Sequence, residues 1–131
     1  MMLLALVAAG GALGALARYG VDRAALALVG AGPADGAFPW ATLAINTSGA
    51  IILAVLLALV QANGGISQQA WAFLAVGILG SYTTFSTMAA DSILLAQSGA
   101  VSTAAAYLLV VPAVGLGAAI IAFVATRSIV A

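Results

Sequence analysis

Several residue types on which most enzymes depend are missing from this sequence. The chain has no histidine, cysteine, lysine or glutamate, and charged side chains make up only 5% of its residues. Without histidine and cysteine it lacks the usual soft metal ligands and the commonest general base. Without lysine it cannot form a Schiff base, and its 3 basic residues are too few to neutralise a nucleic-acid backbone. These absences argue against an enzyme and against a nucleic-acid partner.

The scarcity of charge also argues against a soluble domain. Soluble proteins carry roughly 25% charged residues, whereas this chain is 66% hydrophobic and has a mean hydropathy of +1.29. A surface with so little charge would not stay in water. The sequence therefore predicts an integral membrane protein in contact with lipid. No basic residue precedes Arg18, so we expect the first apolar stretch to be a retained helix and not a signal peptide.

The positions of the few charges divide the chain into long apolar stretches. Residues 36–90 and 92–126 carry no charge at all. Because a membrane helix needs about 20 apolar residues, the sequence predicts helices over about 2–29, 40–61, 69–97 and 102–126. Segments rich in Gly, Pro or polar residues separate them at 30–39, 63–65 and 98–99. The prediction is an all-α membrane protein in which residues 1–131 form a single four-helix transmembrane domain.

The third predicted helix contains a segment that is poorly suited to a continuous helix. Residues 77–84 read Gly-Ile-Leu-Gly-Ser-Tyr-Thr-Thr, and glycine and paired threonines hold a helix poorly. Serine and threonine also cap new helices, so we expect a break, with the second half starting near Thr83 or Thr84. Carbonyl groups that end the first half can hold a cation, and N–H groups that begin the second attract anions. The break is therefore a candidate ion site.

Polar and aromatic side chains near the break are further candidates. Asn46 shares a helical stripe with Thr42 and Gly49, and it suits a pore donor and an interhelical hydrogen bond equally well. Phe85 and Met88 share a helical face, for which ordinary packing is favoured over aromatic edges that face an anion.

Two charged residues have alternative interpretations. Arg18 either provides a vestibule charge for anions or extends to the membrane interface, and the interface is favoured. Asp91 lies about two turns beyond the predicted break. A charge at the bilayer centre costs about 2.5–3.5 kcal/mol, so an interfacial position is favoured for Asp91 over a pore-lining one.

The distribution of arginines bears on orientation in the membrane. Four helices put both termini on one side with Arg127, and they put Arg18 and Arg23 on the other, partly offset by acids. Positive-inside bias is therefore weak, and such a chain can insert both ways and pair with an inverted copy. Small residues four apart, such as Gly10 and Gly14, favour close helix packing, so we expect an oligomer.

Three motifs together carry a resemblance to a known family. Residues 77–87, Gly-Ile-Leu-Gly-Ser-Tyr-Thr-Thr-Phe-Ser-Thr, resemble the third-helix signature of the Fluc (CrcB) fluoride channels. Residues 10–19 and 42–49 are similar to its first-helix and second-helix motifs, and the resemblance covers nearly the whole chain. It implies an antiparallel, dual-topology homodimer with two pores, which lets fluoride leave a bacterial cell passively through the plasma (inner) membrane.

The resemblance also assigns roles to individual residues. It implies a structural sodium ion at the dimer centre, bound by the backbone carbonyls of Gly80 and Thr83. It implies a pore in which Met88 takes the place of the family's second phenylalanine. The pore residues expected on this basis are Asn46, Phe85, Ser86, Thr87 and Tyr107, with Met88 at the replaced position and Arg18 in the first-helix motif.

The sequence departs from the family pattern in ways that keep alternatives open. Asp91 replaces the usual glutamate, and Val111 and Gly115 stand where the family carries hydroxyl groups on the fourth helix. A heterodimer with a paralogue, or a non-conducting membrane subunit that needs such a partner, is one alternative. A small dual-topology proton-coupled exporter is another, although that class relies on a glutamate in its first helix, and this chain has none.

Overall fold

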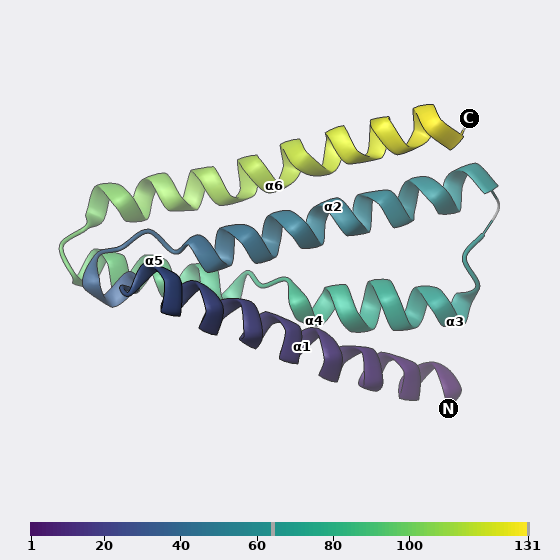
Figure 1. Ribbon diagram of the computed structural model, residues 1–131, viewed down its shortest axis with the longest axis horizontal. Coiled ribbons are helices and arrows are strands. Elements are labelled where there is room, and N and C mark those ends of the chain that lie inside the picture. The colour runs from purple at the N-terminus through teal and green to yellow at the C-terminus, as the bar shows by residue number, and fades with distance from the viewer. Residues whose placement is uncertain (64, 131) are drawn as a thin grey trace.

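The computed structural model describes residues 1–63 and 65–130, and these residues form helices joined by short connections (Figure 1). Four helical segments are long and apolar enough to cross a membrane: Met2–Asp35, Trp40–Ala62, Gln68–Gln97 and Val101–Val130. The predicted all-α class and the four spans are therefore confirmed, and the chain is a multi-pass membrane protein.

The helix boundaries agree closely with the sequence-based ones. The first span is α1 (Met2–Val29), followed by a short 3₁₀ helix, η1 (Pro33–Asp35), inside the predicted 30–39 linker. The second span is α2 (Trp40–Asn63), and the fourth is α6 (Val101–Val130), which runs beyond its predicted end at Thr126. Of the predicted turn at 63–65, Gly64 lies outside the described residues.

The third span is divided as predicted, and its first half has an unpredicted form. It consists of α3 (Gln68–Trp71), the π-helix η2 (Ala72–Leu79), α4 (Gly80–Tyr82) and, beyond the break, α5 (Ser86–Gln97). At the break Thr83 is extended, with φ −75° and ψ 154°. The Oγ1 atom of Thr84 accepts a hydrogen bond from the backbone N of Thr87 at 3.1 Å. Thr84 thus caps the second half of the span, which agrees with the predicted start near Thr83 or Thr84.

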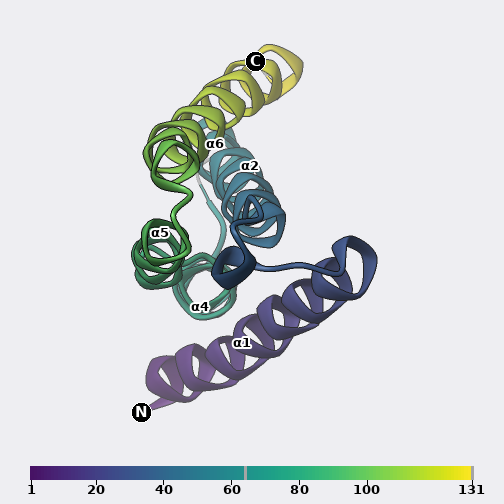
Figure 2. The same cartoon turned by 90° about the vertical axis from the view of Figure 1, so that its left-hand side faces the viewer.

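Both termini lie at the same end of the molecule, as four spans require (Figure 1). Figure 2 shows α6 beside α2, whereas α1 crosses below α4. The backbones of α1 and η2 lie in close contact. A Cβ added at Gly10 would collide with the carbonyl oxygen of Phe73, and one added at Gly14 with that of Ile78. The small residues predicted to allow close packing do so here. At Gly11, by contrast, an added Cβ would meet nothing within 4 Å.

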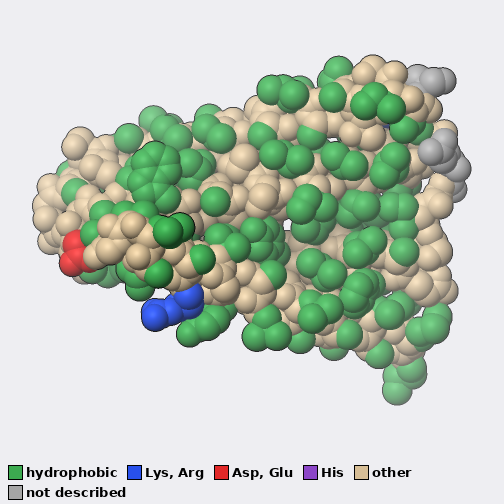
Figure 3. Space-filling model, viewed as in Figure 1, with side chains coloured by type: hydrophobic (Ala, Val, Ile, Leu, Met, Phe, Trp, Pro, Cys, Tyr) green, Lys and Arg blue, Asp and Glu red, His purple; other side chains and the backbone are tan. Residues whose placement is uncertain are grey.

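A buried hydrophobic cluster lies between α5 and α6. It consists of Met88, Leu95, Ala104, Tyr107 and Val111. Most other large apolar side chains are exposed, and they cover much of the face in Figure 3. The charged side chains visible on this face lie towards the end opposite the termini. An apolar exterior of this kind suits a lipid environment.

Candidate ion path at the break in the third span

The amide side chain of Asn46, on α2, binds the backbone at the break. Its Nδ2 donates to the carbonyl oxygen of Thr84 at 3.0 Å, and its Oδ1 accepts from the backbone N of Thr84 at 2.8 Å. One side chain therefore satisfies both main-chain groups of a residue that has left the helical pattern. Of the two interpretations of Asn46, the interhelical hydrogen bond is present. Since the amide carries two N–H donors, one of them remains for a second partner.

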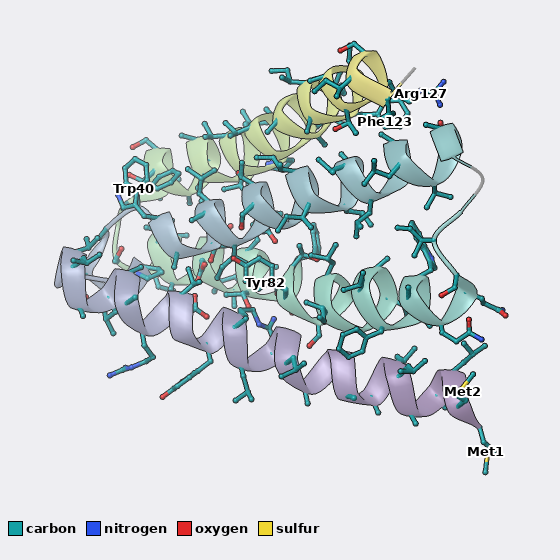
Figure 4. All side chains as sticks on the ribbon, turned by 45° about the vertical axis from the view of Figure 1, so that its right-hand side comes forward. Met1, Met2, Trp40, Tyr82, Phe123 and Arg127 are labelled. Carbon is teal, nitrogen blue, oxygen red and sulfur yellow. The ribbon has the colours of Figure 1, made fainter. Side chains whose placement is uncertain are left out.

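Two neighbours of Asn46 extend this contact along the break. Ser48 Oγ lies 3.0 Å from the hydroxyl of Tyr82, which projects between α4 and α2 (Figure 4). A Cβ added at Gly49 would collide with Cγ2 of Thr83. α2 thus contacts three successive residues, Tyr82, Thr83 and Thr84, and it fixes the direction in which the chain enters α5.

The carbonyl end of the first half is open to a ligand. Because the N–H of Thr84 donates to Asn46, the carbonyl oxygen of Gly80 lacks the donor four residues on that a continuous helix would supply. Gly80 and Thr83 line a cavity of about 300 Å³, together with Asn46 and Gly49. Across residues 1–63 and 65–130, no group of three or more acidic side chains could hold a metal. Backbone carbonyls of this kind serve sodium in broken membrane helices.

The second half begins with a chain of hydroxyl groups. Oγ1 of Thr84 donates to Oγ1 of Thr87 at 3.0 Å and lies 3.3 Å from Oγ of Ser86. Thr84 is buried, Thr87 is partly buried and Ser86 is exposed. These groups stand at the N-terminus of a regular helix, where the backbone dipole favours an anion.

The hydroxyl chain lies between two cavities. The break cavity, of about 320 Å³, is lined by Asn46, Thr84, Phe85, Met88 and residues of α6. The end cavity, of about 260 Å³, lies towards the 30–39 linker and is lined by residues that include Asp22, Trp40, Thr42, Thr87 and Asp91. Thr84 lines the first cavity and Thr87 the second, so their hydrogen bond lies between the two. The lining of the break cavity carries no charged side chain, whereas the carboxylates of Asp22 and Asp91 line the end cavity.

Phe85 and Met88, which are predicted to share a helical face, have different surroundings. Both line the break cavity, but Phe85 is 76% exposed and Met88 is 5% exposed. Phe85 lies before the first residue of α5, whereas Met88 packs in the core with Tyr107 and Val111. Phe85 therefore presents its ring at the surface, where a second chain can contact it.

Asp91 is buried between three helices, and its depth in the membrane stays a prediction. It is 8% exposed, and its Oδ2 accepts hydrogen bonds from the hydroxyls of Thr42 and Tyr107, both at 2.9 Å. These contacts join α5 to α2 and α6. The two hydroxyl donors are far from Asp91 in the sequence, and they offset the cost of burying its carboxylate.

Two other predicted pore residues lie away from the cavities. Tyr107 is fully buried, with its ring edge against Phe38 at a centroid distance of 5.5 Å, and it lines neither the break cavity nor the end cavity. Arg18 is partly exposed on α1 and lines none of the three cavities described here. The α6 wall of the break cavity is Val111, Pro112, Gly115 and Leu116. It has no hydroxyl side chain, as the sequence indicated.

Comparison of the sequence with known proteins identifies its family. Residues 5–123 match the family model described as "CrcB-like protein, Camphor Resistance (CrcB)". The chain belongs to the CrcB family. The match extends from the first span to the fourth, so the CrcB assignment covers the break and both cavities.

Individual CrcB relatives are similar along most of their length. The chain is 43% identical to a protein of Thermus thermophilus over 78% of this chain and 77% of the relative. It is 42% identical to one of Nitrobacter winogradskyi over 87% and 86%, and 39% identical to one of Beijerinckia indica over 95% and 95%. Each of these relatives is named fluoride-specific ion channel FluC. The family resemblance seen in the sequence motifs is therefore confirmed.

Proposed function

We propose that this protein is a passive fluoride-selective channel that lets cytoplasmic fluoride leave the cell, and not an enzyme. The observation that carries this function is the run of uncharged hydroxyl groups, Thr84 and Thr87, that lies between the break cavity and the end cavity. The names of the CrcB relatives, which are 39–43% identical over most of their length, point to the same ion.

Selectivity for fluoride follows from its hydration. Fluoride is small and strongly hydrated, so a path must offer donors that replace water. The N–H of Asn46 and the hydroxyls of Ser86 and Thr87 are such donors, and the ring edge of Phe85 is electropositive. A lining that is mostly neutral binds an anion weakly enough to release it, as conduction requires.

The assembly we propose is an antiparallel, dual-topology homodimer in the bacterial plasma (inner) membrane. The break cavity is open along the surface where Phe85 is exposed, and one thin bundle does not enclose a path. A second, inverted chain would close it. In this assembly the carbonyls of Gly80 and Thr83 from both chains would hold a sodium ion, which would neutralise the carbonyl ends and bind the two breaks together.

The apolar α6 wall supports one alternative, in which a paralogous chain supplies the missing hydroxyls or this chain is a non-conducting subunit. Val111 and Gly115 offer no donor to an anion. A proton-coupled exporter has less support, because the sequence contains no glutamate. Dependence of flux on a proton gradient would distinguish an exporter from a channel.

The test is fluoride efflux from liposomes that contain the purified protein, followed with a fluoride electrode under a potassium–valinomycin clamp. Matched liposomes loaded with chloride measure selectivity. Rapid fluoride efflux without chloride efflux, and without need of a proton gradient, is the expected result. No fluoride efflux from the protein alone would contradict the homodimeric channel and favour the partner-dependent alternatives.

A further inference from the structure

The end cavity carries negative charge, although the proposed path conducts an anion. Its lining includes the carboxylates of Asp22 and Asp91 and no basic side chain. Much of the remaining wall is apolar, with Leu26, Phe38 and Trp40 among its residues. Charges of one sign between low-dielectric walls focus the electric field into a cleft, which draws in ions of opposite sign and repels ions of the same sign. The field of the end cavity therefore opposes the entry of fluoride.

The protein compensates the Asp91 carboxylate by direct contacts. Its Oδ2 accepts hydrogen bonds from the hydroxyls of Thr42 and Tyr107, and the side chain is buried. Hydrogen bonds to an ionised group are stronger than those between neutral groups. Since these two also join α5 to α2 and α6, the charge of Asp91 has a structural use in the bundle.

Asp22 has no comparable partner within the part of the chain that the structure describes. Its side chain is partly exposed on α1, and no hydrogen bond between helices depends on it. Arg18, one turn earlier on α1, attracts the Asp22 carboxylate, whereas Asp91 repels it. Arg18 does not line the end cavity, so its positive charge acts from outside. Asp22 is therefore the acid of this cavity that the protein compensates less.

We propose that Asp22 limits the rate of fluoride conduction, because its carboxylate repels fluoride in the end cavity. This inference rests on the proposed function and names a residue that sets the throughput of that same path. Asp22 does not bind the ion, since its charge acts across the cavity by electrostatic repulsion. The path is thus slower than its hydrogen-bond donors alone would allow.

The test measures the initial rate of fluoride efflux from liposomes that contain Asp22→Asn. Asparagine has nearly the same shape as aspartate and no charge, so this variant is expected to conduct roughly threefold faster than wild type or more. A gain in rate cannot result from misfolding. Asp22→Glu keeps the charge, and its rate is expected to stay within about twofold of the wild-type rate.

Ionic strength distinguishes electrostatic repulsion from a change in the shape of the cavity. The Debye length shortens from about 10 Å at about 0.1 M salt to about 3 Å at about 1 M. With an impermeant salt on both sides of the membrane, the ratio of the Asp22→Asn rate to the wild-type rate should fall towards one over this range. A ratio that stays constant would overturn the proposal.

Asp35→Asn is the matched control, because it removes an acidic charge at the same end of the molecule. Asp35 is exposed and does not line the end cavity. Its Oδ2 accepts from the backbone N of Gly32, and asparagine keeps an oxygen for this bond. Efflux is expected to change by less than about twofold, since solvent screens an exposed charge. Acidic residues contribute little to orientation in the membrane, so neither variant should insert differently from wild type.

The outcomes separate this inference from the proposed function. Absence of fluoride efflux from the wild-type protein would contradict the function itself. With a conducting wild type, a folded Asp22→Asn variant that is no faster would overturn the inference, as would an equal gain in Asp35→Asn. If Asp22→Asn does not fold, Asp22→Ala provides the same comparison, because it removes the same charge.

Discussion

At the scale of single residues, the conformation of the break depends on one amide. Asn46→Asp keeps the acceptor for the N–H of Thr84, but it removes the donor to the Thr84 carbonyl and adds a negative charge beside the break cavity. We expect fluoride efflux to fall roughly tenfold or more, because a hydrogen bond to a charged group contributes about 1.5–3 kcal/mol of free energy. Liposome efflux measures this directly.

Ser48→Ala is the matched control for that substitution. It removes the contact between α2 and Tyr82 without adding charge at the cavity. Its efflux is expected to stay within about twofold of wild type, since one neutral hydrogen bond contributes about 0.5–1.5 kcal/mol to stability and not to ion binding. Equal losses in both variants would mean that α2 packing alone, and not the chemistry of Asn46, sets the rate.

Met88 is largely buried at the position where the family resemblance implies an aromatic residue. It is 5% exposed and packs with Leu95, Tyr107 and Val111. Met88→Phe is expected to lower the free energy of unfolding by about 1–3 kcal/mol through overpacking, whereas Met88→Leu should cost less than about 1.5 kcal/mol. Thermal unfolding in detergent ranks the two variants. A Met88→Phe variant as stable as wild type would show that the ring turns into the break cavity.

Sequence reasoning identified Asn46 and the hydroxyls at the break because local motifs carry them. It did not identify the partners of Asp91, since Thr42 is 49 residues away and Tyr107 is 16 residues away. Such pairings depend on how helices are rotated against one another. A nearly uniform apolar sequence gives little amphipathic signal from which to deduce that rotation.

At the scale of helices, the contact between α1 and η2 depends on particular glycines. A Cβ at Gly14 would collide with the backbone carbonyl of Ile78, which cannot move aside as a flexible side chain can. Gly14→Ala is therefore expected to destabilise the protein by about 1–3 kcal/mol, as overpacking does. Gly11→Ala, in the same helix but with nothing within 4 Å, should be neutral or stabilise by up to about 1 kcal/mol. Thermal unfolding of the two variants in detergent gives the comparison, and a Gly14→Ala variant no less stable than Gly11→Ala would contradict it.

The π-helical first half of the third span explains one limit of prediction from sequence. Composition and length predicted four spans, and the segment rich in Gly and Thr predicted the break. The π-helix at residues 72–79 has no such signature, because its sequence, Ala-Phe-Leu-Ala-Val-Gly-Ile-Leu, suits an α-helix equally well. Tertiary contacts favour the wider turn of a π-helix. Here the backbone of Gly77 lies close to that of Gly10.

At the scale of the whole molecule, orientation in the membrane follows from where the few arginines lie. Arg18 and Arg23 are on α1, whose later residues lead to the linker end, whereas Arg127 lies at the end that carries the termini (Figure 4). So small a difference gives little positive-inside bias. The chain is expected to insert in both orientations, which would allow an antiparallel homodimer to form from one gene product.

The absence of native cysteine allows orientation to be measured with single introduced thiols. Ala34→Cys and Ser128→Cys place exposed thiols at opposite ends of the molecule. In intact inverted vesicles, a membrane-impermeant maleimide should label roughly half of each variant, because neither orientation is favoured. Adding Asp35→Lys, at the Ala34 end, should bias insertion and shift the two labelled fractions in opposite directions. It should also lower fluoride efflux, since antiparallel pairs become rarer. Complete labelling of one variant and none of the other, before any charge is added, would contradict the dual-topology dimer and leave a chain that needs an oppositely oriented partner.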